Sequence, residues 1–128
     1  MSFFESLTWH LLPQSTNLPM INKEQQLGIL VNNAGVFMLP LRRSVDGVEM
    51  HFAVNYLGHF LLTNLLLKHL EKAPSARIVS IAATWINGIN FDDINSEKSY
   101  NCVMAVIQGK QAQLLQLSTC HLLLRGQV

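Results

Sequence analysis

The sequence is poor in charge and in cysteine. Only 13% of its 128 residues are charged, nine basic and eight acidic, and the basic residues form no cluster. Nucleic-acid grooves and anionic membrane faces bind through clustered basic side chains, so this composition argues against both classes of partner. On one helix, Cys102 and Cys120 would lie roughly 27 Å apart, too far for a disulfide. We therefore expect a reduced, intracellular protein, most simply a cytoplasmic one.

Long uninterrupted apolar runs are also missing. The most apolar stretch, residues 56–70, is broken by His59, Thr63 and Asn64, and it is shorter than the roughly 20 residues of a spanning helix. The first residues lack a basic region and include Glu5, so we expect neither a cleaved signal nor a transmembrane segment. Even so, 49% of the chain is hydrophobic. Such a composition predicts either a dense core or an apolar face that meets a partner.

Two aliphatic runs mark the predicted strands. GILVNNAG at residues 28–35 and RIVSIAA at residues 77–83 are continuous apolar segments, typical of strands buried on both faces of a parallel sheet. Residues 1–27 contain two prolines and show no clear period. We predict an irregular segment over residues 1–27, followed by one domain over residues 28–128.

Two helices are predicted around the second strand. The first spans residues 46–70, with Asp46 and Glu49 arranged as a capping box. Its apolar side chains extend beyond one face, which predicts cover on more than one side. The second helix spans about residues 99–124. A strand, a long helix and a second strand predict a parallel pair joined by a right-handed crossover.

The turn after the first strand is a candidate ligand site. Asn32, Asn33, Ala34 and Gly35 place small and polar residues at the carboxyl end of a strand, where backbone can approach a ligand closely. The alternative is a tight turn in which both asparagines bond their own backbone.

Three further segments, taken with this turn, carry a resemblance to a known family. They are DGVEMHFAVNYLGHFLLTNLLL from residue 46, ARIVSIAA from residue 76 and AVIQGKQA from residue 105. Over residues 28–126 the chain resembles the short-chain dehydrogenase/reductase family, in its retinol-dehydrogenase-like and polyprenol-dehydrogenase-like branch. The resemblance implies an α/β fold with a Rossmann-type doubly wound parallel sheet. Of that sheet the chain would hold a central strand–helix–strand–helix slice, with the N-terminal cofactor half largely missing.

The resemblance also implies site residues. The family's catalytic asparagine and lysine map to Asn55 and Lys110, and the turn at residues 32–35 together with Lys110 would contact an NAD(P) cofactor. Two positions depart from the family: Val106 stands where a tyrosine is expected, and Ala83 where a serine is expected. The tyrosine would transfer the proton at the substrate oxygen, and valine has no proton to give.

Neither a substitute acid nor a phosphate loop is evident in the sequence. Tyr100 lies ten residues before Lys110, and Thr84 would point to the opposite face of an extended strand. The chain has no glycine before Gly28, whereas dinucleotide binding in this fold rests on a glycine-rich loop after the first strand. The resemblance thus implies NAD(P), while the missing loop argues against its binding by this chain.

Plainer interpretations of these residues stay open. Lys110 is either the surviving half of a Tyr-x-x-x-Lys pair or an exposed helix lysine. Asn55 is either a remnant of the family's site or a helix residue bonded to local backbone. His51 and His59 lie about 12 Å apart along a helix, so they cannot share a metal, and we predict no metal site. Both cysteines are predicted to be inert core thiols.

Three functions follow, and for this chain we favour the second and the third over the first. The first is NAD(P)-dependent oxidation or reduction of a lipophilic retinol-type or polyprenol-type alcohol or aldehyde, against which the missing tyrosine, serine and loop argue. The second is a non-catalytic module that forms a homodimer or a mixed dimer with a full-length relative, through the helices at 46–70 and 99–124. The third is a truncated product without independent activity.

Overall fold

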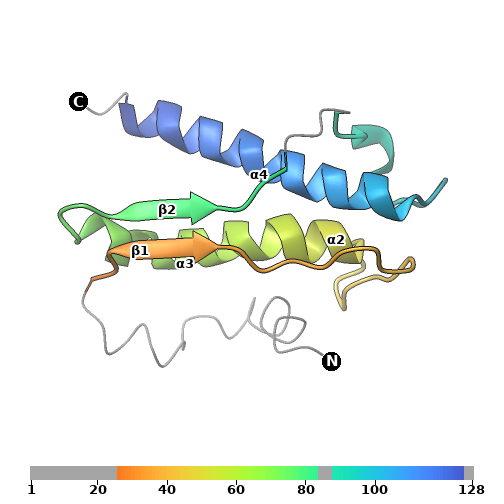
Figure 1. The fold of residues 1–128 in the computed structure, drawn as a ribbon, viewed down its shortest axis with the longest axis horizontal. Helices are drawn as coiled ribbons and strands as arrows, with labels where there is room; N and C mark the ends of the chain where they lie inside the picture. The colour runs from red at the N-terminus through yellow and green to blue at the C-terminus, as the bar shows by residue number, and fades with distance from the viewer. Residues whose placement is uncertain (1–25, 84–87, 126–128) are drawn as a thin grey trace.

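A computed structural model describes residues 26–83 and 88–125 of the chain, with side chains to residue 118 (Figure 1). The predicted irregular segment therefore lies almost wholly outside the described residues, as does Thr84. The elements in chain order are β1 (Ile29–Asn32), α2 (Met50–Phe52), η2 (Ala53–Leu57), α3 (Gly58–Glu71), β2 (Arg77–Ser80), η3 (Phe91–Asp93) and α4 (Cys102–Arg125).

The two strands form a parallel pair, which confirms the predicted α/β arrangement. Ile29 lies opposite Arg77, and Asn32 lies opposite Ser80. The ladder ends at Ser80, three residues before the predicted end of the second strand. The segment from α2 to α3 connects the two strands. Helix α4 follows β2 and lies beside these helices in one layer (Figure 1).

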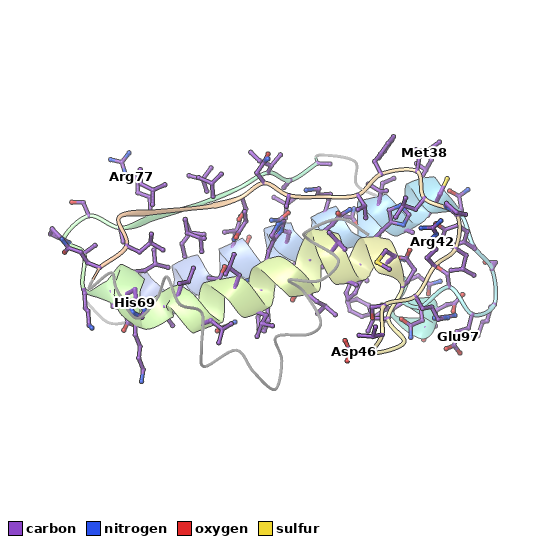
Figure 2. All side chains as sticks on the ribbon, turned by 90° about the horizontal axis from the view of Figure 1, so that it is seen from below. Met38, Arg42, Asp46, His69, Arg77 and Glu97 are labelled. Carbon is purple, nitrogen blue, oxygen red and sulfur yellow. The ribbon has the colours of Figure 1, made fainter. Side chains whose placement is uncertain are left out.

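One face of this sheet is covered and the other is not. Figure 2 shows the helices on one side of the strands, with Arg77 projecting from the other side. On the open face Ile29 is 59% exposed and Val31 is 54% exposed, and Val79 and Ile81 are exposed as well. The prediction of strands buried on both faces is therefore wrong for the described residues. A continuous aliphatic run shows that both faces of a strand can be buried. It does not show that a layer of helices is present on each face.

The first helix begins later than predicted. Residues 44–48 form a turn in which Ser44 Oγ accepts from the Asp46 and Val48 N–H groups, and Gly47 has a φ of +80°. A left-handed residue interrupts a helix, so the predicted start at Asp46 is wrong. Glu49 is the N-cap itself, and its side chain accepts from the Phe52 N–H at 2.9 Å.

A π-helical turn, η2, separates α2 from α3. Its wider ring is closed by the Gly58 N–H, which donates to Ala53 O five residues earlier. Such turns occur mostly as single insertions in α-helices and are frequent at functional sites. Asn55, the candidate catalytic asparagine, lies in this turn and is fully buried.

The last helix also starts later than predicted. It begins at Cys102 and not at Ser99, because Asn101 is its cap and accepts from the Val103 and Met104 N–H groups at 3.0 and 3.1 Å. The helix runs to Arg125, so both cysteines do lie on one helix. In the part of the chain that is described, no helix has the length and apolarity needed to cross a membrane.

Helix α4 crosses α2 and η2 at very short range, and a glycine makes this possible. A Cβ atom on Gly109 would lie 3.2 Å from His51 O and 3.3 Å from Asn55 Cβ. A side chain at residue 109 would therefore be tightly crowded, and a glycine suits the close approach of the two backbones. Gly109 fixes the distance between the two helices that carry Asn55 and Lys110.

We predict that Gly109→Val separates these helices and lowers the free energy of unfolding by about 1–3 kcal/mol, the usual cost of overpacking a core. Urea denaturation followed by circular dichroism measures the change. Gly28→Val is the matched control, because a Cβ at Gly28 meets no atom within 4 Å. Equal losses in both variants would contradict the close crossing at Gly109.

Candidate functional site

The turn after β1 directs its first asparagine into the core. Asn32 is buried, and its Nδ2 donates to Thr63 Oγ1 at 3.1 Å and to Ser80 Oγ at 3.4 Å. These bonds join β1 to α3 and to β2. Asn33 is exposed and Ala34 is half-buried. Within this turn, Asn32 therefore serves packing, while Asn33 faces solvent.

Asn55 forms a two-point contact with the backbone beyond this turn. Its Oδ1 accepts from the Val36 N–H at 2.8 Å, and its Nδ2 donates to Val36 O at 3.0 Å. The sequence analysis also allowed Asn55 to bond the backbone of its own helix. The structure shows a bond to Val36 instead, nineteen residues earlier in the chain. Both polar atoms of the Asn55 side chain are thus committed to holding the turn.

Lys110 reaches from α4 to the end of β2. Its Nζ donates to Ile81 O at 2.6 Å, and the side chain is half-buried. Burial lowers the pKa of the Lys110 amine from its ordinary value. The alternative of a solvated helix lysine therefore does not describe this side chain. Figure 2 shows α4 on the same side of the strands as α3.

Three of the predicted site residues come together at one point. A Cβ atom on Gly35 would lie 3.0 Å from Asn55 Oδ1 and 3.9 Å from Lys110 Nζ. The turn, the asparagine and the lysine therefore lie together in this structure. Val106, one helical turn before Lys110, and Ala83, beyond β2, are half-buried apolar side chains. Neither can donate or accept a proton.

A second polar group links the same helices deeper in the core. His59 Nδ1 lies 3.1 Å from Asn55 O and 3.1 Å from Gln113 Nε2. Burial lowers the pKa of His59, and the nearby charge of Lys110 lowers it further, so this imidazole is neutral at pH 7. Within the described residues, His59 Nε2, Gln113 Oε1 and Asn32 Oδ1 are buried without a hydrogen-bond partner.

The third polar group, at the start of the first helix, was not anticipated from the sequence. His51 is fully buried, and its Nδ1 lies 2.8 Å from Glu49 Oε1, while its Nε2 accepts from the Leu39 N–H at 3.2 Å. An imidazole that accepts at Nε2 must carry its proton on Nδ1, where it donates to the carboxylate. The only sequence signal is the Glu-x-His spacing at a cap, which is too common to identify a buried pair.

Tyr100 belongs to this third group and cannot act as the missing acid. Its hydroxyl donates to Leu39 O at 2.6 Å, and burial raises its pKa, with the negative charges of Glu49 and Cys102 adding to the effect. Tyr100 lies before the start of α4, whereas Val106 lies one turn before Lys110. The tyrosine therefore fixes the loop at Leu39, away from the lysine.

The described residues do not fit a whole dinucleotide. A pyrophosphate is normally bound at a helix N-terminus by free backbone N–H groups. The N-terminus of α2 is occupied by the carboxylate of Glu49, and that of α4 by the side chain of Asn101. A carboxylate at the first of these would repel phosphate. The same part of the chain holds no group of three histidine, cysteine, aspartate or glutamate side chains suited to a metal ion.

We predict that Glu49 makes the fold acid-sensitive. Burial raises the pKa of its carboxyl group, but hydrogen bonds from His51 and from the Phe52 N–H outweigh it, and the net pKa lies below 4.5. Its stabilisation is therefore complete above pH 4.5 and is lost as the pH falls through the lower folded-state pKa. Glu49→Gln should lower the unfolding free energy at pH 7 by about 1 kcal/mol.

Urea titrations at pH 7 and pH 3 measure this difference. The two chains should be closer in stability at pH 3 than at pH 7. Glu97→Gln, which removes a charge from an exposed position, is the control for a general charge effect. A Glu49→Gln deficit that stays constant with pH would contradict the ionised cap.

Comparisons with known proteins identify the family of the chain. Residues 19–88 match the short chain dehydrogenase family. The chain is 47% identical over 98 residues to human retinol dehydrogenase 14, a match that covers 75% of this chain and 29% of that protein. It is 45% identical over 106 residues to human polyprenol dehydrogenase, covering 78% of this chain and 32% of that protein. The chain thus spans about a third or less of these relatives.

A solved structure shows the same likeness. The crystal structure of an uncharacterized protein from Mycobacterium paratuberculosis superimposes with a TM-score of 0.73 and 34% identity, covering 84% of this chain and 40% of that one. The family match begins at residue 19, nine residues before the predicted start of the resemblance at residue 28. The chain belongs to the short-chain dehydrogenase family, and within it is similar to retinol and polyprenol dehydrogenases.

Proposed function

We propose that this oxidoreductase-family chain does not itself interconvert alcohols and aldehydes. The observation that carries the proposal is Val106, an apolar side chain at the position from which the family's proton donor would act beside Lys110. General acid–base catalysis contributes about 100- to 10,000-fold to a rate. Ala83 removes a second hydroxyl that would polarise a carbonyl.

The contacts of the remaining site residues support the same proposal. Both polar atoms of Asn55 are bonded to Val36, and the amine of Lys110 is bonded to Ile81 O. Each of these side chains therefore has a structural partner within the chain. The capped N-termini of α2 and α4 support the proposal as well. The family relation implies NAD(P), but the side chains of Glu49 and Asn101 occupy the N–H groups that would bind its phosphates.

The expected result for the purified chain is no oxidation of NADPH or NADH above the protein-free rate, with retinal or decanal as substrate. Calorimetric titration should detect no binding of either dinucleotide. The double variant Val106→Tyr/Ala83→Ser is the informative companion, because it restores both hydroxyls. If the double variant alone turns over, the missing hydroxyls were the sole deficit. Robust turnover by the unaltered chain would overturn the proposal.

The second candidate is a non-catalytic module that pairs through its long helices. It is favoured by two large apolar side chains on α3, Phe60 and Leu67, which are 43% and 40% exposed and lie two helical turns apart. Side chains at this spacing share one helix face. We propose that this face contacts a second copy of the chain or the matching helix of a full-length relative.

Sedimentation velocity tests this pairing. The unaltered chain should sediment as a dimer, alone or with retinol dehydrogenase 14, and Phe60→Glu/Leu67→Glu should shift it to a monomer because two charges would be buried. Ser75→Glu, on an exposed position in the turn after α3, should leave the dimer intact. A monomeric unaltered chain at all concentrations, in both mixtures, would rule the pairing out.

A further inference from the structure

A polar pocket of about 250 Å³ lies between α4 and the segment at residues 88–101. The polar side chains that line it include those of Asp93, Ser96, Ser99, Asn101 and Gln108. Met104 and Gln108 lie four residues apart and line it from α4. Two residues turn an α-helix by about 200°, so this helix face is opposite the one that carries Val106 and Lys110. The pocket is therefore separate from the candidate functional site.

Gln108 is a buried polar side chain in this pocket. The residue is only 6% exposed, and its Oε1 accepts from the Asn90 N–H at 2.8 Å. A backbone N–H only donates, so this bond fixes which end of the amide is the oxygen and which is Nε2. Within the described residues, Nε2 has no hydrogen-bond partner. A buried donor of this kind is costly unless a ligand or water accepts from it.

The other acceptor atoms of this lining are used by the chain itself. Asn101 Oδ1 accepts from two N–H groups in the first turn of α4, at 3.0 and 3.1 Å. The carboxylate of Asp93 accepts from the N–H groups of residues 97–99, at distances from 2.6 to 3.3 Å. In the same part of the chain, the hydroxyl groups of Ser96 and Ser99 donate to no acceptor. What the pocket offers a ligand is therefore mainly hydrogen-bond donors.

Free donors beside one carboxylate favour a neutral ligand that accepts hydrogen bonds. Asp93 is the one charged residue of the lining, and its charge repels anions. A cation would have to compete with the backbone N–H groups that already hold this carboxylate. Ile89 and Met104 add an apolar wall. The pocket is smaller than the roughly 300–1,000 Å³ of sites for drug-sized ligands, so its ligand is small.

We propose that this pocket binds a small neutral carboxamide. The carbonyl oxygen of the ligand accepts from Gln108 Nε2 and from the hydroxyl group of Ser96 or Ser99, because its two lone pairs allow two such bonds. The short hydrocarbon part of the ligand lies against Ile89 and Met104. The site shares no residue with the turn at residues 32–35, so it is independent of the function proposed above.

The test is an NMR titration of the ¹⁵N-labelled, unaltered chain with ε-caprolactam, a cyclic amide with a hydrocarbon ring. We expect the Gln108 side-chain NH₂ and the Asn90 N–H to shift together and to saturate. The side-chain NH₂ of Gln113, which is buried elsewhere in the core, should stay unchanged. Absence of a saturable shift at Gln108 would overturn the proposal.

Azepane is the matched ligand, because it has the same ring with CH₂ in place of the carbonyl group. It should bind at least about tenfold more weakly than caprolactam, since it offers no acceptor to the free donors. Azepane is a cation at pH 7, so attraction to Asp93 would act in the opposite direction. Equal or tighter binding of azepane would show a site for cations and would contradict the proposal.

Gln108→Glu is the matched variant, because it keeps an oxygen for the Asn90 N–H and replaces the free donor by a second carboxylate oxygen. It should raise the Kd of caprolactam at least about tenfold, since two acceptors would then face each other. Ser99→Ala, on an exposed position, should raise the Kd about two- to tenfold by removing one hydroxyl donor. Ser75→Ala, outside the pocket, should leave it unchanged. An unchanged Kd in both pocket variants would refute the carboxamide site.

Discussion

The fold depends on polar side chains that hydrogen-bond one another where α4 crosses the first helix. Among the described residues the fully or nearly fully buried side chains are more often polar than apolar, and the largest of them are His51, Gln113, Glu49 and Asn55. Buried polar groups are favourable only when they are paired, so the helices have one satisfactory arrangement and not many. Gly109 allows the close approach that these bonds require. Specific geometry here comes from hydrogen bonds, with a small apolar core beside them.

This constraint gives Asn55 and Lys110 a structural role that does not depend on redox chemistry. Asn55 holds the turn at Val36, and Lys110 joins α4 to the end of β2. Either side chain would leave a backbone group unpaired if it were replaced by an apolar one, at a cost of about 1–3 kcal/mol. Val106 and Ala83 have no such partner, so the fold tolerates them without a hydroxyl. Asn55 and Lys110 thus serve the fold itself through these hydrogen bonds.

The sequence predicted the parallel pair and the two long helices, because these follow from strong local patterns, and the family resemblance brought Gly35, Asn55 and Lys110 forward as candidate site residues. It misplaced the first helix start, since Glu49 caps directly after a left-handed Gly47. It missed the buried network at the helix start, where the partners come from three separate segments. It also predicted that both faces of the sheet are buried, which is wrong for the described residues. An aliphatic run indicates that a strand can be buried, but not whether helices pack on each of its faces.

The open face of the sheet affects how the described part of the chain meets other surfaces. Four neighbouring aliphatic side chains, those of Ile29, Val31, Val79 and Ile81, meet water on two strands whose outer edges are also unpaired within the described residues. Holdase chaperones and degradative proteases recognise short extended apolar segments of this kind, in competition with any surface that covers them. A surface that covers this face should therefore shield the described part of the chain from both.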